Sequence, residues 1–312
     1  MTVAVHADWS VDPRKRWMCL AVPTGQGSIL QVEPVGDLVT LLPRLLAWGL
    51  PVALGVDFPI GLPRAYADCL PGDFPAFLRS APPLFFEVAD TIDQVSTQRP
   101  FYPRRGQFGM TRLAHAQALG MATTAGLSRQ CDRATDMRPA GAPLFWTLGA
   151  NQTGKAAISG WLGLLRPALA APGPPALWPF DGPFRGLLRP GRVAIAETYP
   201  AEALRQLGLT LPGSKRRHTD RLAFMPALRN AMARLGAVPD ANLVALLEAG
   251  MGVDAGGEDR LDCVLGVLCV LRVLQGALDV APPDPWVMRW EGWVLGQAWP
   301  KAVPLQADSG YT

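Results

Sequence analysis

The chain has 312 residues, of which 49% are hydrophobic and 18% are charged, and its formal net charge is +3. This composition excludes a disordered chain, and the length is sufficient for a large buried core. The small net charge does not by itself indicate a nucleic-acid-binding protein. Five cysteines without a Cys-x-x-Cys pair and only three histidines argue against zinc and favour reduced thiols in the cytoplasm. The longest apolar run, 263–271, is too short to span a bilayer, so we expect no membrane association.

The first 56 residues predict a compact set of strands and one helix. Apolar runs over 2–9, 16–22 and 28–32 predict three strands with tight connections, which favours an antiparallel meander. Leucines at helical spacing over 36–49 predict a helix. The run 52–56, Val-Ala-Leu-Gly-Val, predicts a fourth strand that is buried on both faces. The crossover helix before it places this strand parallel to the first.

Asp57 follows the fourth strand directly. Pro59, Gly61 and Pro63 come next and prevent the strand from continuing. The carboxylate is therefore expected at the carboxyl end of a buried strand, where ligands bind in open α/β sheets. An isolated Asp before a turn more often only caps that turn, so the functional interpretation depends on the other acidic residues.

The segment 64–191 is dense in Pro and Gly and predicts a large helical and loop insertion between the fourth and fifth strands of one domain, 1–312. Short helices are expected near 73–80, 111–120 and 154–165. The fifth strand is expected over 192–197. Further helices are expected over 201–207, 215–235, 242–249 and 258–274.

Acidic residues end three of the predicted strands, namely Asp8, Asp57 and Glu197. Asp259 and Asp262 are three positions apart and share one face of the last predicted helix. Asp262 stands in an apolar helix, where an unpaired carboxylate is costly, whereas Asp259 also suits the helix dipole. Converging carboxylates without His or Cys favour Mg²⁺ or Mn²⁺, and two such ions support phosphodiester cleavage.

This layout resembles the RNase H-like superfamily, whose β-β-β-α-β-α-β core carries acids after the first and fourth strands and on the final helix. Four short motifs are similar to one branch, the uncharacterised family called domain of unknown function four-two-nine, whose members are predicted nucleases. The motifs are D-F-P-I-G-L-P at 57–63, E-T-Y-P at 197–200, E-D-R-L-D-C at 258–263 and E-G-W-V-L-G at 291–296. The resemblance spans roughly 3–296 and implies an RNase H-like α/β fold with a mixed five-stranded sheet and flanking helices.

Carried over by position, the resemblance implies that Asp8, Asp57 and Asp262 bind metal, with Glu197 and Asp259 near the site. Lys215 and Arg221 resemble a basic pair of that family. Members often have Ala after the last Asp, where this chain has Cys263; both residues are small, so we expect the packing to be preserved.

The leading hypothesis is a magnesium- or manganese-dependent nuclease that acts on DNA or RNA. Asp8 and Asp57 would hold one ion, and Asp8 and Asp262 the other. Glu197 would ligate an ion or orient a water molecule, with Asp259 as a further metal ligand. Basic side chains would hold the phosphates of the nucleic acid; the candidates are Lys215, Arg216, Arg217 and Arg221.

Two alternatives use the same core. An ATP-dependent phosphotransferase of the actin and sugar-kinase type needs a Gly-rich turn after the first acidic residue, but no glycine follows Asp8 in the segment Trp9–Pro13. Gly256-Gly257 precedes a helix, but Glu258 and Asp259 would repel a phosphate there. A non-catalytic scaffold that binds nucleic acid or protein is the second alternative, since some of the ten tryptophans could stack on bases.

Overall fold

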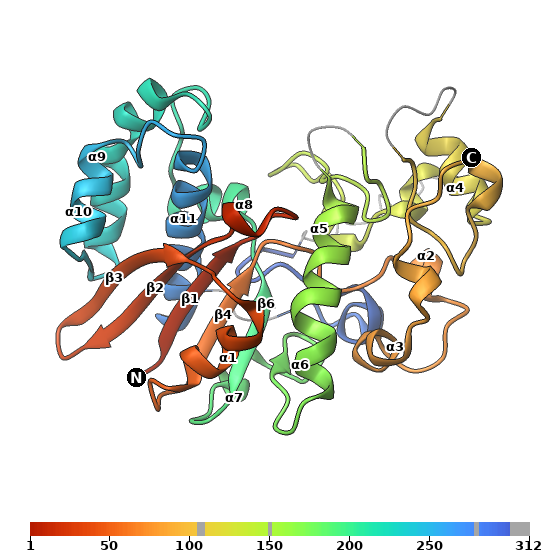
Figure 1. The fold of residues 1–312 in the computed structure, drawn as a ribbon, viewed down its shortest axis with the longest axis horizontal. Coiled ribbons are helices and arrows are strands. Elements are labelled where there is room, and N and C mark those ends of the chain that lie inside the picture. Colours follow the sequence, from red (N-terminus) through yellow and green to blue (C-terminus); the bar gives the residue numbers. More distant parts are fainter. Residues whose placement is uncertain (105–109, 149–151, 278–280, 300–312) are drawn as a thin grey trace, which may run out of the picture.

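The computed structural model describes residues 1–104, 110–148, 152–277 and 281–299. These residues form an α/β protein with a mixed seven-stranded sheet in the order β5-β6-β4-β1-β2-β3-β7 (Figure 1). The strands are β1 (Val3–Asp8), β2 (Trp17–Thr24), β3 (Gly27–Pro34), β4 (Val52–Val56), β5 (Ala176–Leu177), β6 (Val193–Glu197) and β7 (Ala237–Pro239).

Helices cover both faces of the sheet and fill the long connection between β4 and β6. Those outside this connection are α1 (Leu38–Leu46), α8 (Pro200–Leu207), α9 (His218–Arg234), α10 (Ala241–Glu248) and α11 (Gly257–Leu274). Those within it are α2 (Arg64–Ala67), α3 (Phe74–Ser80), α4 (Arg112–Ala118), α5 (Thr153–Gly160), α6 (Arg166–Ala170) and α7 (Phe184–Leu187). Within the described part of the chain, no helix has the length and apolar character needed to cross a membrane.

The strand pairing confirms the antiparallel meander and the parallel fourth strand. β1 pairs antiparallel with β2, and β2 with β3. β4 lies parallel to β1 on its other side, and β6 lies parallel to β4. The carboxyl ends of β1, β4 and β6 therefore lie side by side at one end of the sheet. Asp8, Asp57 and Glu197 stand at these strand ends.

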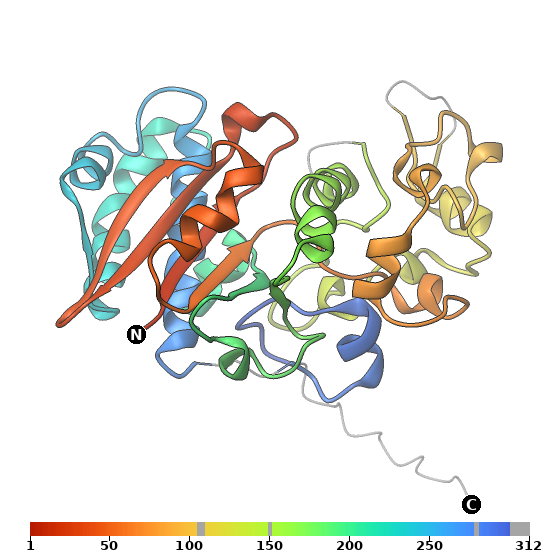
Figure 2. The same cartoon turned by 60° about the horizontal axis from the view of Figure 1, so that its bottom comes forward.

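Large and small side chains alternate along β4, β6 and the first half of β1, and the sheet separates two hydrophobic cores. The larger ones, such as Leu54 and Ile195, pack in one core with α1 and the insertion, which we define as residues 64–191. The smaller ones, such as Ala53 and Ala194, pack in the other core with α11. Figure 2 shows α1 and α11 on opposite faces of the sheet. Because strand side chains alternate between faces, the two cores follow directly from the sequence pattern.

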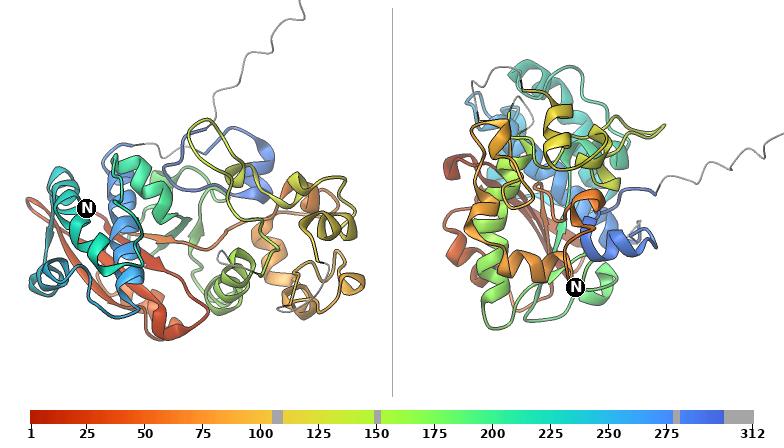
Figure 3. Two further views of the ribbon diagram at one scale, coloured as in Figure 1. Left: turned by 90° about the horizontal axis from the view of Figure 1, so that it is seen from above. Right: turned by 90° about the vertical axis from the view of Figure 1, so that its right-hand side faces the viewer.

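The insertion lies beside the sheet, at the end opposite α9 and α10 (Figures 1 and 3). Its helices α3, α4 and α5 correspond to the three that were expected there. The sheet itself differs from the expectation of five strands, because the insertion contributes β5 beside β6 and the chain adds β7 beside β3. β5 has two residues and β7 has three, so neither is long enough to give an alternating hydrophobic pattern.

Candidate active site

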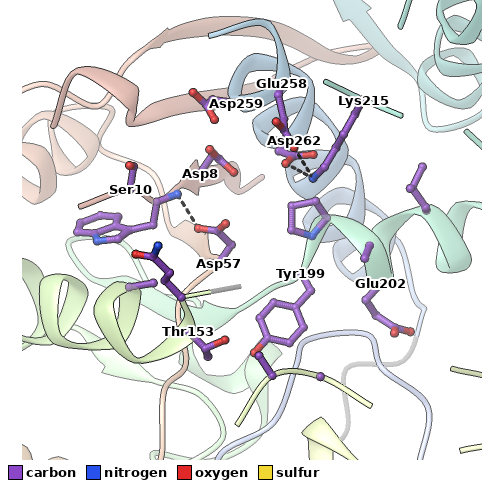
Figure 4. Close-up of a pocket in the computed structure, with 18 of the residues that line it drawn as sticks. Asp8, Ser10, Asp57, Thr153, Tyr199, Glu202, Lys215, Glu258, Asp259 and Asp262 are labelled. Atoms are coloured by element: carbon purple, nitrogen blue, oxygen red, sulfur yellow. Dashed lines mark hydrogen bonds and ion pairs between the residues drawn. The ribbon is translucent and has the colours of Figure 1, made fainter. Parts of the chain in front are cut away.

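A cavity of about 1120 Å³ opens at the sheet edge where β1 and β4 end. One wall is formed by these strand ends, by α8 and by the start of α11, and the opposite wall is formed by the insertion. Figure 4 shows the carboxyl groups of Asp8, Asp57, Asp259 and Asp262 gathered in one part of it. The cavity thus brings together the four acids that the sequence indicated as metal ligands.

Asp8 and Asp57 come from neighbouring parallel strands and lie side by side. Figure 4 shows their carboxyl groups close to each other at the ends of these strands. The backbone N–H of Trp9 donates to Oδ1 of Asp57 at 2.6 Å, which fixes the orientation of that side chain. Asp262 reaches the same place from the first turns of α11 and is buried. Three elements far apart in the sequence therefore hold three buried or half-buried carboxyl groups together.

Burial, together with the proximity of these acids to one another, raises their pKa values. Burial raises the pKa of Asp57 to about 7, and the charge of Asp262 adds to this effect. Burial also raises the pKa of Asp8 well above its ordinary value, together with the charges of Asp57, Asp262 and Asp259. Burial raises the pKa of Asp262 to about 6, although Lys215 opposes the shift. Such a group of carboxyls is stabilised by a nearby positive charge.

Lys215 supplies a positive charge at this position. Its Nζ donates a short hydrogen bond to Oδ2 of Asp262 and lies 3.8 Å from Oε1 of Glu258. The other oxygen of Asp262, Oδ1, is buried and accepts no hydrogen bond from the described residues, and the same holds for Oδ2 of Asp259. Two buried carboxylate oxygens are therefore left without a donor, which is costly for the folded state.

The donor set fits a hard divalent cation, since it consists of carboxylate oxygens with two of them unused. Even so, among residues 1–104, 110–148, 152–277 and 281–299 no group of three or more acidic, His or Cys side chains is already arranged as a metal site. The Nζ of Lys215 lies beside Asp262, where a cation would need access. Because Lys215 binds Oδ2 of Asp262, the unused oxygen Oδ1 is the one that a cation would bind, next to the ammonium group.

His6 lies beneath the acids, two residues before Asp8 and on the same strand face. Its Nδ1 is 2.7 Å from Oγ1 of Thr198, and its Nε2 has no hydrogen-bond partner in the part of the chain that the structure describes. Burial lowers the pKa of His6 to about 3, so the ring is neutral at physiological pH. Its ring packs against Gly266 of α11, which places it in the layer that supports the site.

Glu197 does not join the other acids, which corrects the expectation that it ligates a metal or orients a water molecule. The register pairs Glu197 with Val56, so its side chain lies on the opposite face of the sheet from Asp57. Both of its oxygens are occupied: Arg129 donates to each at 2.6 Å, and the backbone N–H of Ile60 donates to Oε2 at 2.7 Å. Glu197 is thus a structural residue.

Arg129 of the insertion is completely buried. The sequence gives no indication of its role. In addition to Glu197, its guanidinium binds both carboxylate oxygens of Asp132 at 2.9 and 3.0 Å. It also donates to the backbone oxygen of Glu291 at 3.3 Å. This buried network fastens the insertion to the end of β6 and to the C-terminal segment. Its members are separated by up to 162 positions in the chain, so no local sequence signal reveals it.

The four predicted phosphate-binding residues have different environments. Lys215 and Arg216 line the cavity, and Arg216 lies 3.4 Å from Glu258. Arg217 does not line the cavity and pairs with Asp220. Arg221 is buried, and backbone oxygens accept its hydrogen bonds. Those oxygens belong to Lys215, Arg216, Gly250 and Gly252.

The expectation that Arg221 binds substrate is therefore wrong. Its guanidinium is used to hold two loops, 214–217 and 250–252, against α9 and α11. A buried Arg that binds backbone oxygens cannot be distinguished from a surface Arg by the sequence alone. The basic cluster before α9 thus divides into a cavity-lining part, Lys215 and Arg216, and a part that maintains the loop.

Comparison of the chain with protein-family models, with curated proteins and with solved structures gave no match. The fold and the cavity therefore carry the functional argument.

Proposed function

We propose that the protein is a magnesium- or manganese-dependent nuclease with an RNase H-like core, in which Asp8, Asp57 and Asp262 hold the metal. The observation that carries the proposal is the convergence of these three carboxyl groups in one large cavity. The same grouping has no evident structural use, because burying like charges together destabilises a fold. Functional sites are where such arrangements are concentrated.

The order of the elements also supports this proposal. The chain runs β1-β2-β3-α1-β4, then through the insertion to β6, and returns to the sheet edge with α11. The acids stand at the last residue of β1, directly after β4 and on α11, which agrees with the positions implied by the resemblance to RNase H-like proteins. As part of this proposal, the chain belongs to the family that its four short motifs resemble, domain of unknown function four-two-nine.

A divalent cation bound at Asp8, Asp57 and Asp262 would activate water and stabilise the leaving oxygen. The residues of the chain prepare the site for this chemistry. The N–H of Trp9 orients Asp57, and His6 and Gly266 keep α11 close to β1, so that Asp262 faces Asp8. Without a cation, burial raises the pKa of Asp57 to about 7, and a bound divalent cation would lower it by favouring the ionised carboxylate.

The test is Mn²⁺ binding by calorimetry, followed by cleavage assays. We expect the wild type to bind Mn²⁺ and Asp57→Asn and Asp262→Asn to lose most of that affinity. Asp68→Asn is the matched control, because Asp68 is an exposed carboxylate of the insertion that does not line the cavity. Single-stranded and structured DNA and RNA are then screened with Mg²⁺ and Mn²⁺.

Metal-dependent cleavage that persists unchanged in Asp57→Asn would refute the site assignment. If the wild type neither binds Mn²⁺ nor cleaves any nucleic acid, the nuclease proposal fails. Thermal stabilisation by ATP with Mg²⁺ would then favour the phosphotransferase alternative. Nucleic-acid binding without turnover would favour the scaffold.

A further inference from the structure

The wall of the cavity formed by the insertion differs in chemistry from the acid cluster, by which we mean Asp8, Asp57, Asp259 and Asp262. Five cationic side chains line the cavity as a whole: Lys15, Arg138, Arg205, Lys215 and Arg216. Three of them are paired, since Arg205 binds Glu202, Lys215 binds Asp262, and Arg216 lies near Glu258. Among the described residues, Lys15 and Arg138 have no ion pair. Lys15 is exposed, whereas Arg138 is half-buried in the wall formed by the insertion.

Arg138 is held in place by its backbone while its guanidinium is left available. The N–H of Thr135 donates to the oxygen of Arg138 at 2.9 Å, and the N–H of Arg138 donates back at 3.2 Å. These two bonds close a tight turn over 135–138. The Nη2 atom of Arg138 is buried, and no acceptor for it lies among the described residues. A buried donor of a charged group without a partner is unfavourable. Because Arg138 lines the cavity, a ligand that draws the side chain toward the cavity would supply the missing acceptor.

The charges of Asp132 and Glu202 act on Arg138, but neither carboxylate forms an ion pair with it among the described residues, and each is paired with another arginine. Asp132 is engaged through both oxygens by Arg129. Glu202 accepts two hydrogen bonds from Arg205, at 2.8 and 3.1 Å. The wall therefore presents one unpaired guanidinium to a cavity whose other end holds the acid cluster. A planar guanidinium is well suited to bidentate binding of a phosphate group.

We propose that Arg138 binds a phosphate group of a single-stranded nucleic acid or nucleotide, while the phosphodiester bond that is cleaved lies at the acid cluster. This inference rests on the proposed function and names its substrate class. The cavity has walls on two sides, and its volume of about 1120 Å³ is close to the roughly 300–1,000 Å³ of small-ligand pockets. It matches a few nucleotides of one strand and not a duplex. The insertion thereby becomes the part of the protein that favours a single strand over a duplex.

The experiment measures binding without requiring cleavage. A short fluorescent oligothymidylate is titrated in Ca²⁺ against the wild type, Arg138→Ala, Arg138→Lys and Arg133→Ala. Arg133 is the matched control, because it lies in the same segment, is exposed and does not line the cavity. We expect Arg138→Ala to weaken binding about tenfold or more, Arg138→Lys to weaken it less, and Arg133→Ala to have little effect.

Salt dependence separates a direct phosphate contact from a change in folding. Loss of one phosphate contact should reduce the slope of log affinity against log salt by about one in Arg138→Ala and leave it unchanged in Arg133→Ala. Thymidine 5′-monophosphate is titrated as a second probe. If it shows the same loss in Arg138→Ala, the phosphate contact is made to a single nucleotide; if only the oligonucleotide does, the contact requires a strand.

Mn²⁺ calorimetry on the same variants keeps this inference separate from the proposed function. Arg138→Ala that binds Mn²⁺ normally but binds the oligonucleotide weakly supports the phosphate-binding role. Equal oligonucleotide affinity and equal salt slope in Arg138→Ala and the wild type overturn it, even if metal-dependent cleavage is found. Tighter binding of a duplex than of a single strand by the wild type overturns the assigned substrate class.

Discussion

Gly266 of α11 lies directly against the imidazole ring of His6 in β1, so closely that a Cβ atom at position 266 would be 2.2 Å from Cγ of His6. Asp262 precedes Gly266 by about one helical turn, and Asp8 follows His6 by two residues on the same strand face. The absence of a side chain at position 266 therefore sets the distance between α11 and β1, and with it the approach of Asp262 to Asp8.

Gly266→Ala should lower the free energy of unfolding by about 1–3 kcal/mol, because the added methyl group overpacks a buried contact. It should also weaken Mn²⁺ binding, since α11 must move away from β1. Urea unfolding and calorimetry measure the two effects. Gly186→Ala is the control, because a Cβ there meets nothing within 4 Å. Equal stability of Gly266→Ala and the wild type would contradict the close contact.

Glu197→Gln and Asp57→Asn should have opposite effects. Glu197→Gln removes the charge that Arg129 pairs with and should cost about 1–3 kcal/mol of stability, while Mn²⁺ affinity stays the same. Asp57→Asn should lose Mn²⁺ binding and, in EDTA near neutral pH, be at least as stable as the wild type, because a repelling charge is gone. Unfolding and calorimetry on both variants provide the test. Loss of Mn²⁺ binding in folded Glu197→Gln would instead indicate that Glu197 is a metal ligand.

The acid cluster predicts an unusual pH dependence of stability in EDTA. The folded-state pKa of Asp57 is about 7 and that of Asp262 about 6, both above the ordinary value of 3.8. The folded protein therefore holds more protons than the unfolded chain between about pH 4 and 7, and stability contributed by these groups decreases as the pH rises through that range.

The difference between the wild type and Asp57→Asn in unfolding free energy, measured across this range, isolates the contribution of the cluster. We expect the wild type to lose stability relative to Asp57→Asn as the pH rises from about 4 to 7, because the buried carboxyl group must give up its proton in the folded state. Mn²⁺ should restore the loss at pH 7. A constant difference would show that Asp57 titrates normally.

Lys215→Met tests whether Lys215 competes with a cation for Asp262. Removing its ammonium group should make Mn²⁺ binding tighter by about tenfold, since a charge of the same sign no longer lies beside the ligand. It should also decrease the stability of the protein in EDTA. Arg217→Met is the control, because it removes the same charge from the same loop but pairs with Asp220 outside the cavity. Weaker Mn²⁺ binding in Lys215→Met would instead indicate that Lys215 helps to hold the site together.

The parts of the structure that the sequence predicted are those with a local pattern. The alternation of large and small residues in β1, β4 and β6 and the apolar run of α11 are enough to place Asp8, Asp57 and Asp262. The same alternation also contains the information that Glu197 faces the other way. In β6, Val193, Ile195 and Glu197 occupy the large-residue face, whereas Asp57 follows the small-residue face of β4. The position of each acid in the alternation of its strand therefore distinguishes Glu197 from Asp57.

The parts that could not be predicted depend on contacts between distant segments. Arg129 is one of 29 basic residues, and its partner Glu197 lies 68 positions away. Arg221 belongs to a basic cluster whose other members are half-buried or exposed, so its burial is decided by the loops that cover it. Arg138 lies in a segment rich in Pro and Gly with no periodicity. In each case the tertiary structure, and not the local sequence, determines the role of the charge.

The buried pair between Arg129 and Glu197 limits how the two parts of the protein can change independently. A shortened protein without residues 64–191 would retain a carboxylate at the end of β6 in an apolar environment, with no guanidinium to pair with. Such a deletion would have to be accompanied by an apolar substitution at Glu197. For the same reason, an insertion taken from another protein could replace residues 64–191 only if it placed an arginine beside Glu197, where Arg129 now lies.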